Sequence, residues 1–263
     1  MGNEGSKGKS KSGTTIQGTL NGIRGGPSSS TVTKHMEMAQ KTRVLQLKNS
    51  GIKKFPENAA ELVDILRNIE LSQNKLTMLP PFIGDFSQLK QLHLSDNCLE
   101  SLPEEIGQLN SLEVLNLANN RLTVLPSSFP NLESLRNLDL EGNSFQQFPL
   151  SLVKLGDLDL LNLAQNGITE IPDEIASLNV SELNMNRNRL SRISPQIGYC
   201  PRLKVLRVEE NCLEKTAFTK QILEDSTINI ISYAGNLFQD KDFQYLPGYD
   251  AYQLRYTATR RKI

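Results

Sequence analysis

The chain has 263 residues, equal numbers of basic and acidic side chains, and 38% hydrophobic residues. This composition excludes wholesale disorder, and a formal charge of zero excludes the general basic footprint of a protein that binds nucleic acid. Three scattered cysteines are too few for a disulfide framework or a zinc site, so we expect no metal and no cofactor.

The first segment, residues 1–34, is rich in Gly, Ser and Thr, which predicts a flexible arm that cannot form a core. It opens with MGNEGS, which matches the N-myristoylation motif M-G-x-x-x-[ST] and predicts Gly2 as the acylated residue. One myristoyl chain binds a membrane only weakly, so stable attachment needs a second signal. Lys7, Lys9 and Lys11 supply one, because each adds up to ~1 kcal/mol on an anionic leaflet.

The next stretch, HMEMAQKTRV, is typical of an amphipathic cap in front of a repeat array. The array itself follows the pattern L-x-x-L-x-L-x-x-N-x-L-x-x-L-P. Its best copies are LRNIELSQNKLTMLP, LKQLHLSDNCLESLP, LEVLNLANNRLTVLP, LRNLDLEGNSFQQFP and LDLLNLAQNGITEIP. Degenerate copies before and after these bring the number to nine, so we expect a repeat domain with its cap over residues 35–240.

One position of the repeat holds asparagine in every copy but the first, where Ser50 takes its place. Successive positions are 22 to 25 residues apart. The asparagines are Asn74, Asn97, Asn120, Asn143, Asn166, Asn188, Asn211 and Asn236. An amide both donates and accepts hydrogen bonds, so we interpret this column as a structural ladder that satisfies buried backbone groups of adjacent repeats.

This array resembles the leucine-rich repeat family, in the 23-residue intracellular variety whose strand segment ends in Leu-Pro. The resemblance covers about residues 42–240. It implies an α/β repeat fold, a leucine-rich-repeat solenoid with a curved parallel β-sheet on the concave face and short helical or 3₁₀ segments on the convex face. Secreted relatives usually have cysteine-bearing caps, which this chain lacks.

Residue spacing within one repeat agrees with that architecture. Leu92 and Leu94 lie two apart and point to one face of a short strand, so His93 between them points to the other. Ile106 and Leu109 lie three apart, a spacing that suits a short helical return path. A single repeat cannot bury enough apolar surface to stand alone, so stability grows with the stack, which needs a cap at each end.

The last segment, residues 241–263, is expected to be that second cap, followed by a basic tail. Its aromatic residues are interpreted as a lid over the final repeat. They are Phe243, Tyr245, Tyr249, Tyr252 and Tyr256.

Catalytic residues are not predicted. His93, Ser95 and Asp96 are close in sequence, but the repeat places the first two on the strand face and the third in a turn, with nothing to pair a base with a nucleophile. The outward strand positions instead predict a protein-binding face, because stacked strands form an extended concave surface. The candidate partner-binding residues are His93, Asn116, Asp139, Glu141, Asn162, Asn184 and Arg207.

Two functional interpretations remain open at this stage. In the first, the chain is a non-enzymatic interaction module for an unknown protein partner. A myristoyl group then holds it at the cytoplasmic side of a membrane, and a cytosolic pool remains. In the alternative, it is a soluble scaffold or regulatory subunit of a signalling or phosphatase complex without lipid attachment. Neither interpretation involves nucleic acid or a small-molecule substrate.

Overall fold

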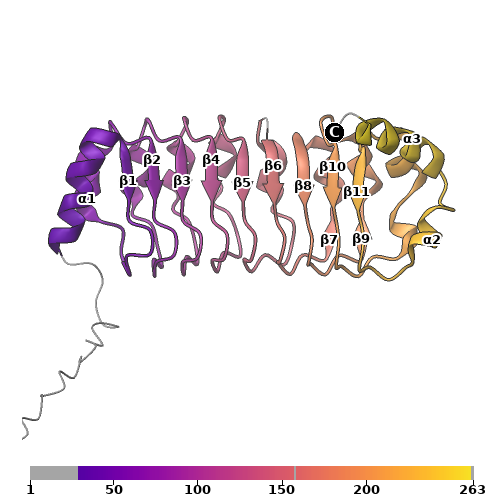
Figure 1. Ribbon diagram of the computed structural model, residues 1–263, viewed down its shortest axis with the longest axis horizontal. Helices are drawn as coiled ribbons and strands as arrows, with labels where there is room; N and C mark the ends of the chain where they lie inside the picture. The colour runs from indigo at the N-terminus through magenta and orange to yellow at the C-terminus, as the bar shows by residue number, and fades with distance from the viewer. Residues whose placement is uncertain (1–28, 157, 262–263) are drawn as a thin grey trace, which may run out of the picture.

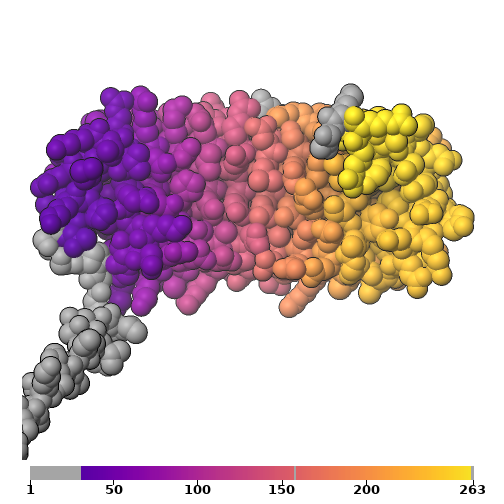
Figure 2. All heavy atoms as spheres, in the orientation of Figure 1, coloured from indigo at the N-terminus to yellow at the C-terminus, as the bar shows by residue number. Residues whose placement is uncertain are grey.

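The computed structural model describes residues 29–156 and 158–261, which form one row of stacked repeats between two terminal caps (Figure 1). The space-filling view shows this row as a continuous elongated body (Figure 2). Gly2, Lys7, Lys9 and Lys11 lie outside the described residues. Their predicted role in membrane attachment therefore stays a prediction.

The repeats are joined along the row by a parallel β-sheet. In the described part of the chain, nine strands pair in parallel in the order β1-β2-β3-β4-β5-β6-β8-β10-β11. They are β1 (Val44–Gln46), β2 (Asn68–Glu70), β3 (Gln91–His93), β4 (Val114–Asn116), β5 (Asn137–Asp139), β6 (Leu158–Asn162), β8 (Val180–Asn184), β10 (Val205–Arg207) and β11 (Ile230–Ser232). A second, two-stranded sheet, which the sequence pattern did not predict, pairs β7 (Glu170–Ile171) with β9 (Arg192–Ile193).

Short 3₁₀ segments return the chain along the opposite side of the core, as the spacing of apolar residues predicts. They are Glu57–Leu62, Pro81–Asp85, Glu104–Gln108, Phe129–Asn131, Leu150–Lys154, Asp173–Ser177, Pro195–Tyr199 and Lys215–Ala217, and a π-helical turn follows at Gln221–Asp225. Pro103 directly precedes the third of them with extended backbone angles, φ −71° and ψ 154°. The proline therefore ends the extended segment at a point where no ladder N–H is required.

The core lies between the strands and the 3₁₀ segments. Leu92, Leu94, Ile106 and Leu109 are all fully buried, which confirms the faces assigned to them from their spacing. Each side chain of this size contributes about 1.5–3 kcal/mol when it is taken out of water. Because every repeat adds several such residues to one continuous cluster, stability depends on contact between neighbouring repeats.

The asparagine ladder is present, and Asn120 shows its geometry. Its Oδ1 accepts from the Leu99 N–H at 3.0 Å, and its Nδ2 donates to the carbonyls of Leu94 and Leu117 at 3.0 Å. One side chain thus satisfies backbone groups of its own repeat and of the preceding one. Ser50 does not join this pattern, because its Oγ donates only within its own turn, to the Lys48 carbonyl at 3.3 Å.

The residue just before each ladder position has a left-handed backbone. Gly142 (φ +65°) and Gly235 (φ +76°) adopt this conformation without a Cβ penalty. At the other positions it is adopted by Asn49, Gln73, Asp96, Asn119, Gln165, Arg187 and Glu210. A left-handed residue with a Cβ costs roughly 1–2 kcal/mol, so the hydrogen bonds of the following ladder residue must offset strain at most turns.

The N-terminal cap is helix α1 (Ser29–Thr42), which buries Met36 and Ala39 against the first repeat. The helix begins before residue 35, so residues 29–34 belong to the cap. They were predicted to lie in the arm. Val32, within residues 29–34, packs against the core, which is a reason for this stretch to be helical.

The C-terminal cap consists of α2 (Asp240–Phe243) and α3 (Tyr249–Arg260), which cover the last strand (Figure 1). Phe243 is buried and stacks on Tyr233 with ring centroids 4.1 Å apart. The Tyr252 hydroxyl accepts the N–H of Ile231 in the edge strand at 3.1 Å. Tyr245 does not belong to the lid, since it is 87% exposed.

Candidate functional site

We call the surface made by the outward side chains of the nine-stranded sheet the strand face. Six of the seven candidate residues form one row on it, since each pairs in register with the next. The row is His93, Asn116, Asp139, Asn162, Asn184 and Arg207. Parallel strands lie about 4.7–4.9 Å apart, so these side chains make a continuous polar stripe. Their role in binding stays a prediction.

Backbone hydrogen bonds hold the middle of this row in place. Asn116 Oδ1 accepts from the N–H two residues further on at 3.0 Å, and Asp139, Asn162 and Asn184 repeat this contact at 3.1, 3.1 and 3.0 Å. Such local bonds to Asn and Asp favour one side-chain orientation. The stripe is therefore ordered before any partner arrives, which lowers the entropy cost of binding.

Two acids lie at the centre of the strand face. Glu141, the seventh candidate, accepts hydrogen bonds from Asn162 Nδ2 at 2.9 Å and from Gln165 Nε2. Partial burial raises the pKa of the Asp139 carboxyl, and the nearby Glu141 charge raises it further. The N–H of Glu141 and the amide of Asn162 oppose these effects by stabilising the charged form. The centre of the face is thus acidic and already hydrogen-bonded.

The far end of the row is occupied by ion pairs. Arg207 Nε lies 2.6 Å from Glu182 Oε1, and Arg187 contacts both carboxylate oxygens of Glu210 at 3.1 Å. Sequence reasoning selected Arg207 but missed Glu182, its partner in the preceding repeat. Glu182 lies two positions before Asn184, which pairs in register with Arg207, so the repeat alignment already places it on the same face of the neighbouring strand.

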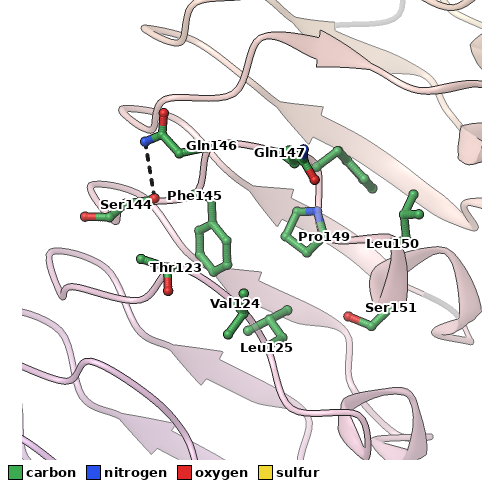
Figure 3. A pocket seen from close by; sticks show the side chains of 11 residues that line it. Thr123, Val124, Leu125, Ser144, Phe145, Gln146, Gln147, Pro149, Leu150 and Ser151 are labelled. Carbon is green, nitrogen blue, oxygen red and sulfur yellow. Dashed lines mark hydrogen bonds between the residues drawn. The ribbon is translucent and has the colours of Figure 1, made fainter.

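A second feature lies in the loops that follow the ladder positions. Between two neighbouring repeats, Val124, Phe145 and Leu150 line a cavity of about 430 Å³ together with small polar residues (Figure 3). A larger cavity of about 730 Å³ lies nearer the N-terminus, with Phe55 and Phe82 among its lining residues. Basic residues surround it, a combination that the sequence analysis did not single out.

We call a set of exposed basic and apolar side chains along these loops in the first half of the row the N-terminal ridge; the exposed acid Glu100 lies in the same loops and is not counted in it. The ridge consists of Lys53, Lys54, Lys75, Met78, Arg121 and Val124. Both apolar members are largely in contact with solvent, with exposed fractions of 67% for Met78 and 66% for Val124.

Over residues 29–156 and 158–261, no cluster of three or more His, Cys, Asp or Glu side chains is arranged to hold a metal ion. None of the helices described by the structure has the length and apolar character needed to span a bilayer.

Comparison with known proteins agrees with this geometry. Residues 81–158 match a leucine-rich repeat region. Over 80% of this chain, the leucine-rich repeat domain of APL1B superposes with a TM-score of 0.63 and 22% identity, which bears on the fold alone.

Two further structures share 28% identity with this chain. One is PEPR1-AtPEP1, with a TM-score of 0.60 over 71% of this chain. The other is the ectodomain of the receptor kinase GASSHO1/SCHENGEN3 from Arabidopsis thaliana in complex with CASPARIAN STRIP INTEGRITY FACTOR 2, with a TM-score of 0.59 over 70%. This chain spans only 27% and 25% of those two proteins, and 59% of the APL1B domain.

Proposed function

We propose that this chain, whose fold is a leucine-rich-repeat solenoid, is a protein-binding module that is held at the cytoplasmic face of a membrane by a myristoyl group on Gly2. The observation that carries the binding half is the strand-face row. It presents ordered polar side chains in register over six strands, from His93 to Arg207. An extended ordered surface of this kind favours a protein or peptide over a small molecule, which binds best in a deep apolar pocket.

The similar structures support the same class of ligand. One is the ectodomain of a plant membrane receptor kinase in complex with CASPARIAN STRIP INTEGRITY FACTOR 2, and another is PEPR1-AtPEP1. We transfer only the class of ligand from them, a protein or peptide on the solenoid, because this chain spans only about a quarter of each of those proteins.

The membrane half of the proposal rests on the sequence. Gly2 and Ser6 fit the acylation motif, and Lys7, Lys9 and Lys11 follow it closely. The first repeat, AQKTRVLQLKNSGIKKFP, and the tail with its YTATRRK segment also resemble leucine-rich repeat-containing protein 57. That resemblance implies an intracellular, N-myristoylated repeat protein without known enzymatic activity.

Substitutions on opposite sides of the solenoid test the binding half. Asn116→Arg combined with Asn162→Arg places two charges on the strand face. Asn131→Arg with Ser177→Arg adds the same charge at exposed positions of the 3₁₀ segments. We expect proximity labelling to lose its main partners with the strand-face pair and to keep them with the control. Identical partner sets for the two variants would contradict the assignment of the face.

Metabolic labelling with a myristate analogue tests the membrane half. We expect label on the wild-type chain, none on Gly2→Ala, and a shift of the variant from membrane to soluble fractions. Mass spectrometry that finds a free or acetylated amino terminus on the native protein would favour the alternative, a soluble scaffold or regulatory subunit.

A further inference from the structure

The N-terminal ridge combines four exposed basic side chains with two exposed apolar ones. Within the described part of the chain, Lys53, Lys54 and Lys75 form no ion pair, whereas Arg121 lies 3.7 Å from Glu100. Met78 lines the same groove as these bases, Val124 follows Arg121 by three residues, and both have about two thirds of their surface in solvent. At Met78 the exposed apolar surface is continuous with the apolar lining of a groove, which makes this region a candidate interaction surface.

A groove runs beneath the ridge. Phe55 and Phe82 contribute aromatic rings to it, with centroids 5.7 Å apart, and Met78 lies at its edge. The charged residues that line its volume of about 730 Å³ are Lys53, Lys54, Glu57, Lys75 and Arg121. Four bases against one acid, with Glu100 nearby, leave a positive rim around an apolar floor. That combination suits a ligand with an apolar body and an anionic head.

The corresponding loops of the last repeats have a different character. Arg192 there is neutralised by Glu170 at 3.2 Å and by Asp173 at 2.9 Å. Glu214 adds a further acid in these loops, whereas Glu174 lies on a 3₁₀ segment and has its equivalent in Glu105 of the first half. The later loops also hold an exposed base, Arg189, and an exposed apolar side chain, Leu237 at 66%, so the first four repeats are distinguished by the groove that four bases and two phenylalanines line.

The ridge also lies next to the place where the N-terminal segment joins the solenoid. Val32 and Thr33, in the first turns of α1, line a cavity of about 620 Å³ together with Lys53 and Lys54. Residues 1–28 continue from this point. A chain of that length spans at most about 100 Å when fully extended, so a membrane bound at Gly2 is within reach of the ridge.

We propose that the N-terminal ridge and its groove bind the surface of an anionic phospholipid bilayer, with Met78 and Val124 inserted at the interface and the four bases on lipid phosphates. Charge complementarity selects this occupant, because the ridge and Lys7, Lys9 and Lys11 have the same sign and would meet the same negative leaflet. The inference deepens the proposed function, since it rests on a membrane being the site of action. It adds that the solenoid contacts the bilayer and is oriented by it.

Vesicle sedimentation of the full, unacylated chain tests the ridge without the lipid anchor. We expect binding to vesicles of 70% phosphatidylcholine and 30% phosphatidylserine, no binding to phosphatidylcholine alone, and loss of binding as salt rises. Lys53→Glu with Lys54→Glu is expected to weaken partitioning at least tenfold. The matched control is Lys154→Glu with Lys204→Glu, which changes net charge equally at exposed positions elsewhere and is expected to retain most of the affinity.

Insertion is tested by fluorescence, because the chain has no tryptophan. Met78→Trp places a single reporter on the ridge, and Leu254→Trp places one on α3, where Leu254 is 74% exposed. We expect a blue shift of emission with anionic vesicles for the first variant and none for the second. Equal shifts, or equal losses for the two lysine pairs, overturn the proposal, as does absence of wild-type binding to anionic vesicles.

The acylated chain separates this inference from the proposed function. If acylated wild type and its Lys53→Glu/Lys54→Glu variant bind anionic vesicles equally, the ridge is not a membrane contact, although the lipid anchor stands. If the native chain is not acylated but the unacylated ridge binds vesicles with the expected pattern, the anchor fails and the ridge stands.

Discussion

The asparagine ladder and the strand-face row run side by side along the same repeats but differ in their contacts. Asn120 bonds to backbone groups of two repeats and is almost fully buried. Asn116, on the strand face, is half-buried and bonds to the N–H of its own strand end. The ladder position keeps one residue type because the backbone groups that it bonds recur in every repeat. The residue type on the strand face varies, because most backbone groups there are already paired within the sheet and do not require a particular side chain.

The largest expected effect concerns the core between the two. Leu115→Ala removes a fully buried side chain from β4 and is expected to lower the free energy of unfolding by about 2–5 kcal/mol. Urea denaturation followed by circular dichroism measures this. Val114→Ala, at the neighbouring outward position, is the control and is expected to cost under about 1 kcal/mol. If both variants lost the same free energy of unfolding, the assignment of Leu115 to the buried face and of Val114 to the outward face would be wrong.

The ladder is tested by Asn120→Ala. The change leaves the Leu99 N–H and the carbonyls of Leu94 and Leu117 without the amide, and each buried unsatisfied group costs about 1–3 kcal/mol. We expect a loss of about 3 kcal/mol in denaturant titrations.

Ser50→Ala is the matched control for the ladder, because Ser50 holds the same column without bridging repeats. Its expected cost is within about 0.5 kcal/mol. A comparable loss at both positions would show that the cross-repeat hydrogen bonds are not the source of the ladder's stability.

A smaller effect is expected on the strand face. Asn116→Ala removes one local bond to the Ala118 N–H and is expected to cost about 0.5–1 kcal/mol, similar to loss of a helix cap. Partner recovery in proximity labelling is expected to fall much more than stability does. A variant that loses stability but keeps its partners would show that Asn116 is structural only.

The smallest effect is expected for Asp139→Asn and depends on pH. Burial raises the pKa of the Asp139 carboxyl in the folded chain, so the folded state binds this proton more tightly than the unfolded state does. The resulting stability is present at acidic pH, below the ordinary Asp pKa of about 3.9, and is lost as pH rises through the folded pKa. The variant is therefore expected to be more stable than wild type at pH 7, by at most about 0.5 kcal/mol, and to lose this advantage near pH 4. Thermal melts at both values measure the difference, and an advantage independent of pH would contradict this origin.

The repeat register was predictable from the sequence because each buried position recurs at nearly constant spacing. Leu92, Leu94 and Asn97 were assigned to the core and the ladder from that spacing alone, and all three are buried. The helical state of residues 29–34 was not predictable, since SSTVTK has the composition of the arm, whereas the packing of Val32 against the core is a tertiary contact. Tyr245 was placed in the lid because composition does not tell which aromatic side chain of a cluster faces inward.

The candidate binding surfaces were also predictable from the sequence only in part. The alignment of His93 with Asn116 and Asp139 follows from the repeat. The Arg207–Glu182 pair and the raised pKa of Asp139 depend on distances and burial that a pattern does not contain. The groove below the N-terminal ridge is of the latter kind, because its lining residues come from four successive repeats.

The sequence by itself determined the solenoid, since every copy of the repeat has apolar residues at the positions that must be buried, and all but the first have an asparagine at the position that pairs backbone groups. Only the tertiary structure decided where the surface is charged, apolar or already paired. Those properties arise between side chains more than twenty residues apart in the chain, such as Lys53 and Lys75, that stacking brings to one groove. The local sequence pattern determines whether a side chain points into the core or outward. Contacts between neighbouring repeats determine whether the outward surface is charged, apolar or already paired.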